Sequence, residues 1–239
     1  MTAIQKNISD KIVAVLLPII IAISFIACKK KNDTPAPDTS NLAIVDASVG
    51  GWQLDFRING QKYNQQALRY DTILPYTSVT AGAQGFSLTA ADNAFRVLIS
   101  SPVNLRKDHY YTVFIGSLKE LPYAPLFVIT QEDLTPADDK AKVRLINVGA
   151  DTQPVNLYVS GMDTPLFVQL PFREATLFKT IDAGDHYNFQ IRESAQAAAI
   201  ASINDVKLEK GKLYTIYVKG FKSDDTAAGK LKLGLISNK

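Results

Sequence analysis

Side chains that could carry out acid, base or nucleophilic chemistry are few in this chain of 239 residues. Two histidines are present, His109 and His186, and a serine hydrolase would need one of them as its base. The sequence contains no G-x-S-x-G segment to present a nucleophile, and we expect both histidines to be solvated turn residues. Asp46 and Asp55 are the carboxylates that would best suit glycoside hydrolysis, which needs two acids across a cleft.

Acidic residues gather in one segment, at Glu132–Asp133 and Asp138–Asp139, and Asp151 follows a short distance further on. Calcium binding would need clustered oxygen ligands, but the pattern D-x-[DN]-x-[DN]-G does not occur, so we expect a solvated acidic linker. One cysteine and two histidines are too few for a Cys/His metal cluster, and no glycine-rich phosphate loop is present. The sequence therefore predicts no metal and no cofactor.

The charge balance argues against nucleic acid as a partner. The chain has 26 Lys and Arg against 23 Asp and Glu, a net charge of +3, and its body has no segment that interleaves basic and aromatic residues. A hydrophobic share of 46% with 21% charged residues is typical of globular domains, so we expect the chain to fold around apolar cores.

The single cysteine comes directly after an apolar segment near the N-terminus. Lys6 and Lys11 precede 16 uncharged residues, Ile12–Ala27, and Cys28 follows them. This run is shorter than the roughly 20 residues that span a membrane as a helix, whereas a basic start, an apolar run and a small residue are typical of a secretory signal. The string Phe25–Cys28 resembles the lipobox of bacterial lipoproteins, in which the cysteine is lipid-modified and becomes the new N-terminus.

We therefore expect residues 1–27 to be a removed signal peptide and Cys28 to carry acyl chains that give lasting membrane attachment. The alternative is a retained signal anchor in which Cys28 is incidental, with Lys29–Lys31 kept in the cytoplasm. Residues 28–41 are polar, contain two prolines, and are expected to form a lipid-anchored flexible tether. No aspartate follows Cys28, although an aspartate there commonly signals retention in the inner membrane. We therefore favour the outer membrane of the cell envelope, and either face of that membrane is possible.

From residue 42 onward the sequence can be laid over itself at an offset of about 100 residues, which is too long for a solenoid repeat. Two single-residue insertions account for a drift of the offset from 101 to 103. The matching segments are Leu42–Ala47 with Val143–Val148, Leu54–Gly60 with Val155–Gly161, Thr80–Gly82 with Asp182–Gly184, and Leu105–Ile115 with Leu208–Val218. We predict two tandem domains of one fold, residues 42–138 and 139–239.

Within each repeat, apolar residues recur at every second position. This holds for Leu54–Ile58 and Tyr111–Ile115 in the first repeat, and for Val155–Val159 and Tyr214–Val218 in the second. Such alternation predicts strands with one face toward the core and one toward water, as in antiparallel sheets. Short strands, frequent turns and about 100 residues per unit predict an all-β protein of two immunoglobulin-like or transthyretin-like antiparallel β-sandwiches.

One segment fits this pattern less well. Glu193–Ser202 is rich in alanine and has helical propensity, whereas its counterpart in the first repeat, Ala94–Ser101, has the composition of a strand. Because homologous repeats share a backbone path, we predict a strand over Glu193–Ser202, with a helix as the alternative.

The second repeat carries a recognisable pattern: V-R-L-I-N-V-x-x-D-x-x-x-V-N-L-Y-V-x-G over Val143–Gly161, then Ala183–Gly184, and L-x-x-G-K-x-Y-T-I-Y-V over Leu208–Val218. This pattern resembles the bacterial domain of unknown function 4397. The first repeat is more divergent, with Gly50–Trp52 where the second has Asp151–Gln153. The resemblance implies exported, often lipid-anchored β-sandwich proteins and carries no catalytic residue to this chain.

The repeat also bears on the candidate residues. Asp46 and Asp55 align with asparagines in the second repeat, a change that suits hydrogen bonds to nearby backbone rather than catalysis. Trp52 is the only tryptophan and aligns with Gln153, so the fold does not require an indole there and Trp52 is a candidate ligand-binding residue. The alternative is that Trp52 packs against the neighbouring domain or caps the end of the sandwich.

Together these features predict a non-catalytic cell-envelope lipoprotein with a binding or structural role. Its expected partners are the membrane, through the lipid on Cys28, and an envelope protein or a glycan. One alternative is a glycan-binding accessory lipoprotein of polysaccharide uptake, with Trp52 as a stacking platform. The other is a hydrolase that uses Asp46 and Asp55.

Overall fold

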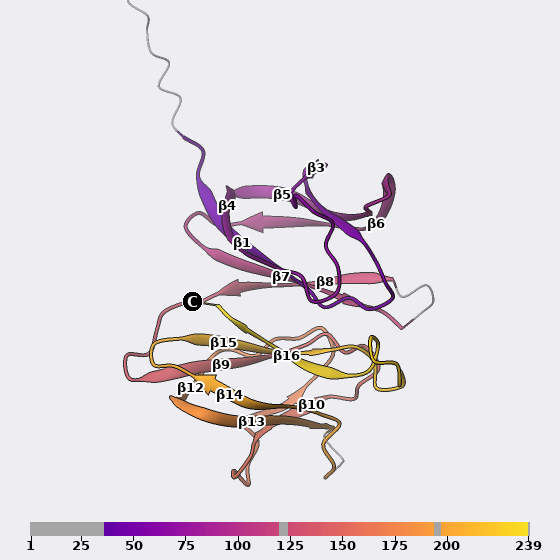
Figure 1. Ribbon diagram of the computed structural model, residues 1–239. Helices are drawn as coiled ribbons and strands as arrows, with labels where there is room; N and C mark the ends of the chain where they lie inside the picture. The colour runs from indigo at the N-terminus through magenta and orange to yellow at the C-terminus, as the bar shows by residue number, and fades with distance from the viewer. Residues whose placement is uncertain (1–35, 120–123, 194–196, 239) are drawn as a thin grey trace, which may run out of the picture. The chain divides into compact units, whose positions relative to one another are not determined.

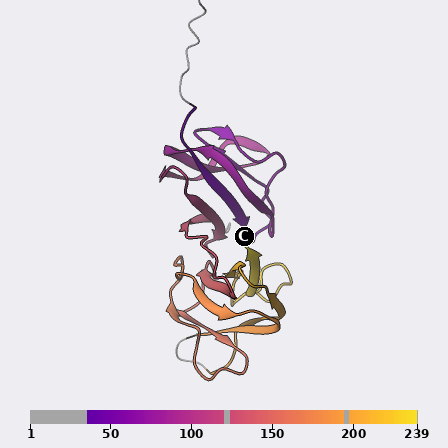
Figure 2. The same ribbon diagram turned by 90° about the vertical axis from the view of Figure 1, so that its left-hand side faces the viewer.

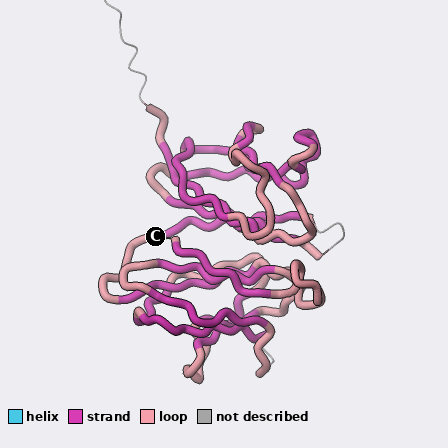
Figure 3. Tube along the Cα trace, in the orientation of Figure 1, coloured by secondary structure: helices cyan, strands magenta, loops and turns pink. Residues whose placement is uncertain are grey.

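The computed structural model describes residues 36–119, 124–193 and 197–238. These residues form sixteen β-strands, and no helix occurs among them (Figure 3). Strands β1–β8 and β9–β16 each build a sandwich of two four-stranded sheets (Figure 1). The predicted all-β fold with tandem sandwiches is confirmed. The signal peptide and Cys28 lie outside the described residues, and the end of the predicted tether, Thr39–Asn41, already belongs to the first strand.

The strands of the two sandwiches correspond one to one. Those of the first are β1 (Thr39–Asp46), β2 (Leu54–Ile58), β3 (Gln61–Lys62), β4 (Ile73–Thr80), β5 (Gly82–Ala90), β6 (Asn93–Leu105), β7 (Tyr110–Ser117) and β8 (Pro125–Glu132). Those of the second are β9 (Lys140–Asn147), β10 (Val155–Val159), β11 (Phe167–Leu170), β12 (Lys179–Asp182), β13 (Gly184–Glu193), β14 (Ala201–Leu208), β15 (Leu213–Lys219) and β16 (Lys232–Ser237).

The sheet topology is the same in both halves. The first sandwich has the strand orders β4-β1-β7-β8 and β3-β2-β5-β6, and the second has β12-β9-β15-β16 and β11-β10-β13-β14. Between these named strands the pairing is antiparallel, as predicted, except that β1 runs parallel to β7 and β9 runs parallel to β15. Figure 2 shows the same strands after a 90° turn.

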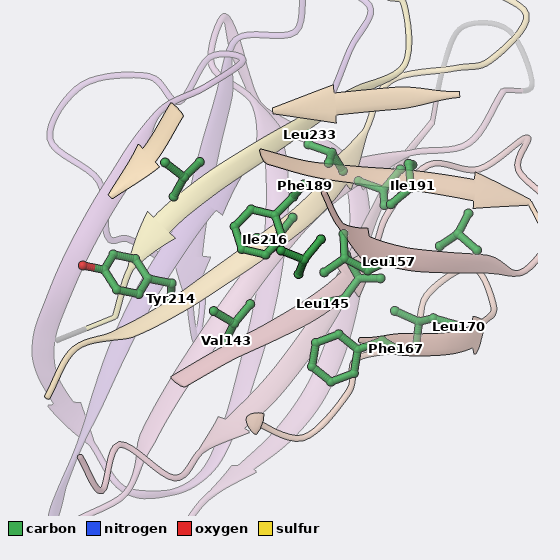
Figure 4. Packing of buried hydrophobic residues seen from close by; sticks show 14 of the residues in the cluster. Val143, Leu145, Leu157, Phe167, Leu170, Phe189, Ile191, Tyr214, Ile216 and Leu233 are labelled. Atoms are coloured by element: carbon green, nitrogen blue, oxygen red, sulfur yellow. The ribbon is translucent and has the colours of Figure 1, made fainter. Parts of the chain in front are cut away.

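Each sandwich encloses an apolar core formed by the residues that alternate along its strands. In the first, Phe56 and Phe86 are fully buried with ring centroids 5.0 Å apart. In the second, Leu157, Phe189 and Ile216 are equally buried, and Figure 4 shows them among their neighbours. Each such side chain stabilises the fold by about 1.5–3 kcal/mol through the removal of apolar surface from water.

A third apolar cluster contains residues from both sandwiches. Phe114 of β7 and Tyr217 of β15 have ring centroids 5.7 Å apart, and Val45, Val128 and Ile146 belong to the same cluster. All of β15 and all but the first residue of β7 are buried. The prediction that alternating strands turn one face to water is therefore wrong for β7 and β15, because their second faces contribute to this junction cluster.

Two local predictions are also corrected. Glu193–Ser202 is not a continuous strand, because β13 ends at Glu193, β14 begins at Ala201, and residues 197–200 form a bend. Positions 194–196 lie outside the described residues. In the first sandwich the corresponding hairpin stays paired up to Ala90 and Asn93, so the repeats share their strands but not this tip. His186 lies within β13 and not in a turn.

Candidate functional site

Trp52 lies where the loop after β1 meets the hairpin turn between β5 and β6. The Ala91 N–H donates a hydrogen bond to the Gln53 carbonyl oxygen at 2.9 Å, and Leu54 pairs with Ala90 in the ladder between β2 and β5. These backbone contacts hold the end of the loop against the hairpin. The position of the indole is therefore set by two paired strands rather than by the loop alone.

The two glycines before Trp52 let the chain turn at this point. Gly50 and Gly51 have φ angles of 101° and 73°, which glycine adopts without steric cost. The indole is half-buried against the first core, and the guanidinium carbon of Arg96 lies 5.5 Å from its ring centroid, within cation–π range. We call the adjoining space the Trp52 cavity; its volume is about 360 Å³ and its lining residues are Gly51, Trp52, Gln53, Ala90, Ala91, Asp92 and Arg96.

The second sandwich has a carboxylate at the position of Ala90. Ala90 and Glu193 are equivalent by register, since each pairs with the first residue of the neighbouring strand, β2 or β10. Glu193 accepts a hydrogen bond from the Gln153 N–H at 3.1 Å and pairs with Lys222 Nζ at 2.8 Å, which holds the pKa of Glu193 below its usual range. Ala90 of the first sandwich can make neither of these contacts.

A larger cavity is linked to the Trp52 cavity by a hydrogen bond between one lining residue of each. Arg69 Nη2 donates to Gln53 Oε1 at 3.2 Å; Gln53 lines the Trp52 cavity and Arg69 lines the larger one. The larger cavity has a volume of about 620 Å³, and its lining residues are Tyr63, Asn64, Gln65, Gln66, Ala67, Arg69, Thr72, Leu74, Pro75 and Thr77. The lining of the larger cavity therefore contains amide, hydroxyl and guanidinium side chains and one aromatic ring, mostly on the loop between β3 and β4. Sequence reasoning did not find this lining, because its residues form no motif.

Asp46 is buried at the end of β1. Its Oδ1 accepts hydrogen bonds from the Ser48 N–H at 2.9 Å and the Ser48 hydroxyl at 2.5 Å, while burial raises the pKa of Asp46 to about 6. Asn147, its counterpart, accepts a hydrogen bond from the Gly149 N–H at 3.0 Å. The predicted side-chain-to-backbone bond is present in both sandwiches.

Asp55 stands on β2, in the other sheet of the first sandwich, and its contacts differ from those of Asp46. Its Oδ1 lies 2.8 Å from Lys62 Nζ and accepts a hydrogen bond from Asn64 Nδ2 at 3.3 Å. Its counterpart Asn156 accepts a backbone hydrogen bond from the Gln169 N–H at 2.6 Å, so here the two repeats differ. The two aspartates stand in different sheets and have separate partners, an arrangement that fits structural roles.

The histidines make local contacts. His109 Nδ1 lies 2.7 Å from the Lys107 carbonyl oxygen, in the turn before β7 where the sequence predicts it. His186 is exposed on β13, with Nδ1 2.5 Å from Asp205 Oδ1 on β14, and Asp205 raises the pKa of His186. The prediction of a turn at His186 is wrong, because His186 lies on β13 and its side chain contacts Asp205 on the neighbouring strand β14.

The acidic linker is partly buried rather than fully solvated. Glu132 and Arg144 make two contacts of 2.6 Å with side chains at most 4% exposed, and Arg144 Nε donates to Thr215 Oγ1 at 2.8 Å. Asp151 accepts hydrogen bonds from the backbone N–H groups of Lys222 and Ser223. The prediction of a solvated acidic linker is wrong at Glu132. Within the described ranges, no group of three or more Asp, Glu, His or Cys side chains is placed to hold a metal ion.

The membrane attachment stays a prediction, since residues 1–27 and Cys28 fall outside the described part of the chain. Among the residues that the structure does describe, none belongs to a helix with the length and apolar character needed to cross a bilayer.

The repeated sheet topology shows that this is a protein of two tandem β-sandwiches. The family described as Domain of unknown function (DUF4397) matches residues 40–158 and again residues 141–238, and the chain belongs to this family. The resemblance seen in the sequence is thereby confirmed. Among curated proteins, none matches the chain.

Two solved structures show weak similarity. The first is a family CBM26 module of Amy13K from Eubacterium rectale in complex with maltoheptaose, with a TM-score of 0.26 and 12% identity over 82% of this chain and 95% of the other. The second is a streptococcal virulence factor described as binding alpha-glucan, with a TM-score of 0.24 and 10% identity over 78% of this chain and 95% of the other.

Proposed function

We propose that this protein is a non-catalytic binding lipoprotein of the bacterial cell envelope, anchored through Cys28, and that its first sandwich binds a glycan in the Trp52 cavity. A sugar ring offers a face of C–H groups, which packs on an aromatic ring, and hydroxyls, which need donors and acceptors at its rim. Trp52 supplies the aromatic ring, while Gln53, Asp92 and Arg96 supply the polar groups.

The observation that carries this proposal is the difference between the two sandwiches at one position. At this position the second sandwich has Glu193, whose carboxylate pairs with Lys222, whereas the first has Ala90 and an adjoining cavity. The repeat thus carries a charged, paired side chain where the first sandwich has a methyl group. An indole in the lining of the Trp52 cavity, where the other repeat has Gln153, supports a role in ligand contact.

The adjoining cavity supports a ligand longer than one sugar ring. Gln53 lines one cavity and Arg69 lines the other, and a hydrogen bond joins their side chains. Gln65 and Gln66 are exposed along the larger cavity, where their amides can both donate and accept hydrogen bonds. This pattern suits an oligosaccharide whose hydroxyls present both kinds of group.

The test uses the fluorescence of the only tryptophan. The full chain, purified in detergent, is titrated with a panel of neutral and acidic oligosaccharides, and the Trp52 emission is recorded with calorimetry in parallel. We expect a saturable change with at least one glycan. Trp52→Ala should weaken binding by calorimetry at least tenfold, and Ala90→Glu, which introduces the closing carboxylate, should do the same.

The matched control is Gln153→Ala, which changes the equivalent position of the second sandwich and should leave affinity unchanged. Binding that survives both Trp52→Ala and Ala90→Glu would place the glycan elsewhere and overturn the site. The absence of any glycan binding by the folded full chain would overturn the proposed ligand class.

A further inference from the structure

Arg69 is the only charged residue in the lining of the larger cavity. Its side chain is exposed, and among the described residues it forms no ion pair with an Asp or Glu side chain. Its guanidinium makes one hydrogen bond, to Gln53 Oε1. A guanidinium has five N–H donors, so most of those of Arg69 remain available to a ligand.

The backbone around Arg69 is held in place by hydrogen bonds. Leu68 exchanges two of them with Leu54, the first residue of β2, at 2.8 and 2.9 Å. The Arg69 N–H donates to Thr72 Oγ1 at 3.0 Å, and the Thr72 N–H donates to the Arg69 carbonyl oxygen at 2.8 Å. Because Gln53 also lines the Trp52 cavity, its bond to Arg69 keeps this cation beside a ligand that spans both cavities.

The second sandwich has no cation at the position of Arg69. Leu68 and Leu170 are equivalent by register, since each pairs with the first residue of the neighbouring strand, β2 or β10. The residue that follows is Arg69 in the first sandwich and Pro171 in the second. The first sandwich therefore has a positive charge that its repeat lacks.

A second difference changes the charge in the same direction. Ala90, which lines the Trp52 cavity, is equivalent to the acidic Glu193 of the second sandwich. The Trp52 cavity also contains Asp92 and Arg96, whose opposite charges offset each other, so Arg69 supplies the net charge of the two linings. A ligand that carries negative charge is complementary to this balance.

We propose that the glycan is acidic, with the carboxylate of a uronic acid bound by Arg69 while a neighbouring sugar ring packs on Trp52. This inference rests on the proposed function, because it names the class of glycan that the same site binds. An arginine can hold a carboxylate through two parallel hydrogen bonds. Asp92 repels a carboxylate from the Trp52 cavity, which places the acidic sugar at the Arg69 end.

The test compares acidic oligosaccharides with their methyl esters, which keep the sugar skeleton and remove its charge. Tetra- to hexasaccharides of galacturonic, glucuronic and mannuronic acid are titrated by calorimetry into the full chain in detergent. We expect at least one acid to bind at least tenfold more tightly than its ester. Arg69→Gln should remove most of this preference, and Arg69→Lys, which keeps the charge without the paired donors, should retain part of it.

The matched control is Arg173→Gln. Arg173 is exposed on the loop between β11 and β12, the counterpart in the second sandwich of the loop that carries Arg69. This variant lowers the net charge of the chain by the same amount and should leave the preference for acids unchanged. Thermal melting of each variant should stay close to that of the parent, because both arginine side chains are exposed.

Equal binding of acids and esters by the parent, with Trp52→Ala weakening both, would overturn this inference and leave the proposed glycan site in place. A preference for acids that survives Arg69→Gln, or that Arg173→Gln lowers by the same factor, would overturn it as well. The absence of binding to every acid, ester and neutral oligosaccharide would refute the proposed function itself.

Discussion

Asp46→Asn is expected to stabilise the protein at neutral pH. Burial raises the pKa of Asp46 to about 6, roughly two pH units above the 3.8 of an unburied aspartate, and no described group donates a hydrogen bond to its Oδ2. Because the folded state holds the proton more tightly than the unfolded chain, this carboxyl has no effect on stability below about pH 4. It becomes increasingly destabilising as the pH rises to 6. A pKa shift of one unit corresponds to about 1.4 kcal/mol, so at pH 7 this carboxylate lowers the free energy of unfolding by about 3 kcal/mol.

The asparagine removes this cost and keeps the acceptor for the Ser48 N–H, as Asn147 does toward Gly149 in the second sandwich. The free energy of unfolding is measured in urea between pH 4 and 8, with Trp52 emission reporting on the sandwich that contains Asp46. The variant should exceed the parent by about 1–3 kcal/mol at pH 7.5, with the difference vanishing near pH 4.

Asp46→Ala serves as the control, because it removes both the charge and the acceptor and should gain less than the asparagine. A variant no more stable than the parent at pH 7.5, or a gain that is the same at every pH, would refute this reasoning.

Three further predictions concern other parts of the chain. Glu132→Leu and Arg144→Met should each lower the free energy of unfolding by about 3–5 kcal/mol, since each leaves a buried charged partner uncompensated, while the variant that combines both should return close to the parent in a double-mutant cycle. Gly234→Ala should lower the free energy of unfolding by about 1–3 kcal/mol, because a Cβ there would overlap the Tyr217 ring. Thermal melting should show a lower melting temperature, and an unchanged one would contradict this packing. Cys28→Ala should abolish labelling by radioactive palmitate, and persistent labelling would disprove the lipid anchor.

Much of the fold could be predicted from the sequence because two signals agree. The period-two spacing identifies strands such as Leu54–Ile58, and the offset near 100 residues shows that each strand recurs. Strand direction is not encoded in the spacing, so the parallel pairing of β1 with β7 could not be anticipated. The junction cluster was also missed, although Phe114 and Tyr217 interrupt the alternation with apolar rings on the face assigned to water.

The candidate site was found only in part. Trp52 stands out because the other repeat lacks an indole, a difference that is visible in the sequence. The cavity beside it is lined by Ala90, which has no carboxylate, whereas the equivalent residue of the second sandwich is Glu193. Only the strand register shows that these two residues are equivalent. The partner of Glu132 likewise comes from strand β9, and only the folded chain shows the contact between Glu132 and Arg144.

The junction cluster has a consequence for how such chains evolve. A lone sandwich of this type would expose Phe114 and Val128, or Ile146 and Tyr217, to water. Relatives that carry one copy of the domain should therefore have hydrophilic substitutions at these positions, or cover them with another subunit. After the duplication, loss of either half would leave the survivor prone to aggregation, so selection would retain both halves even where only one binds a ligand.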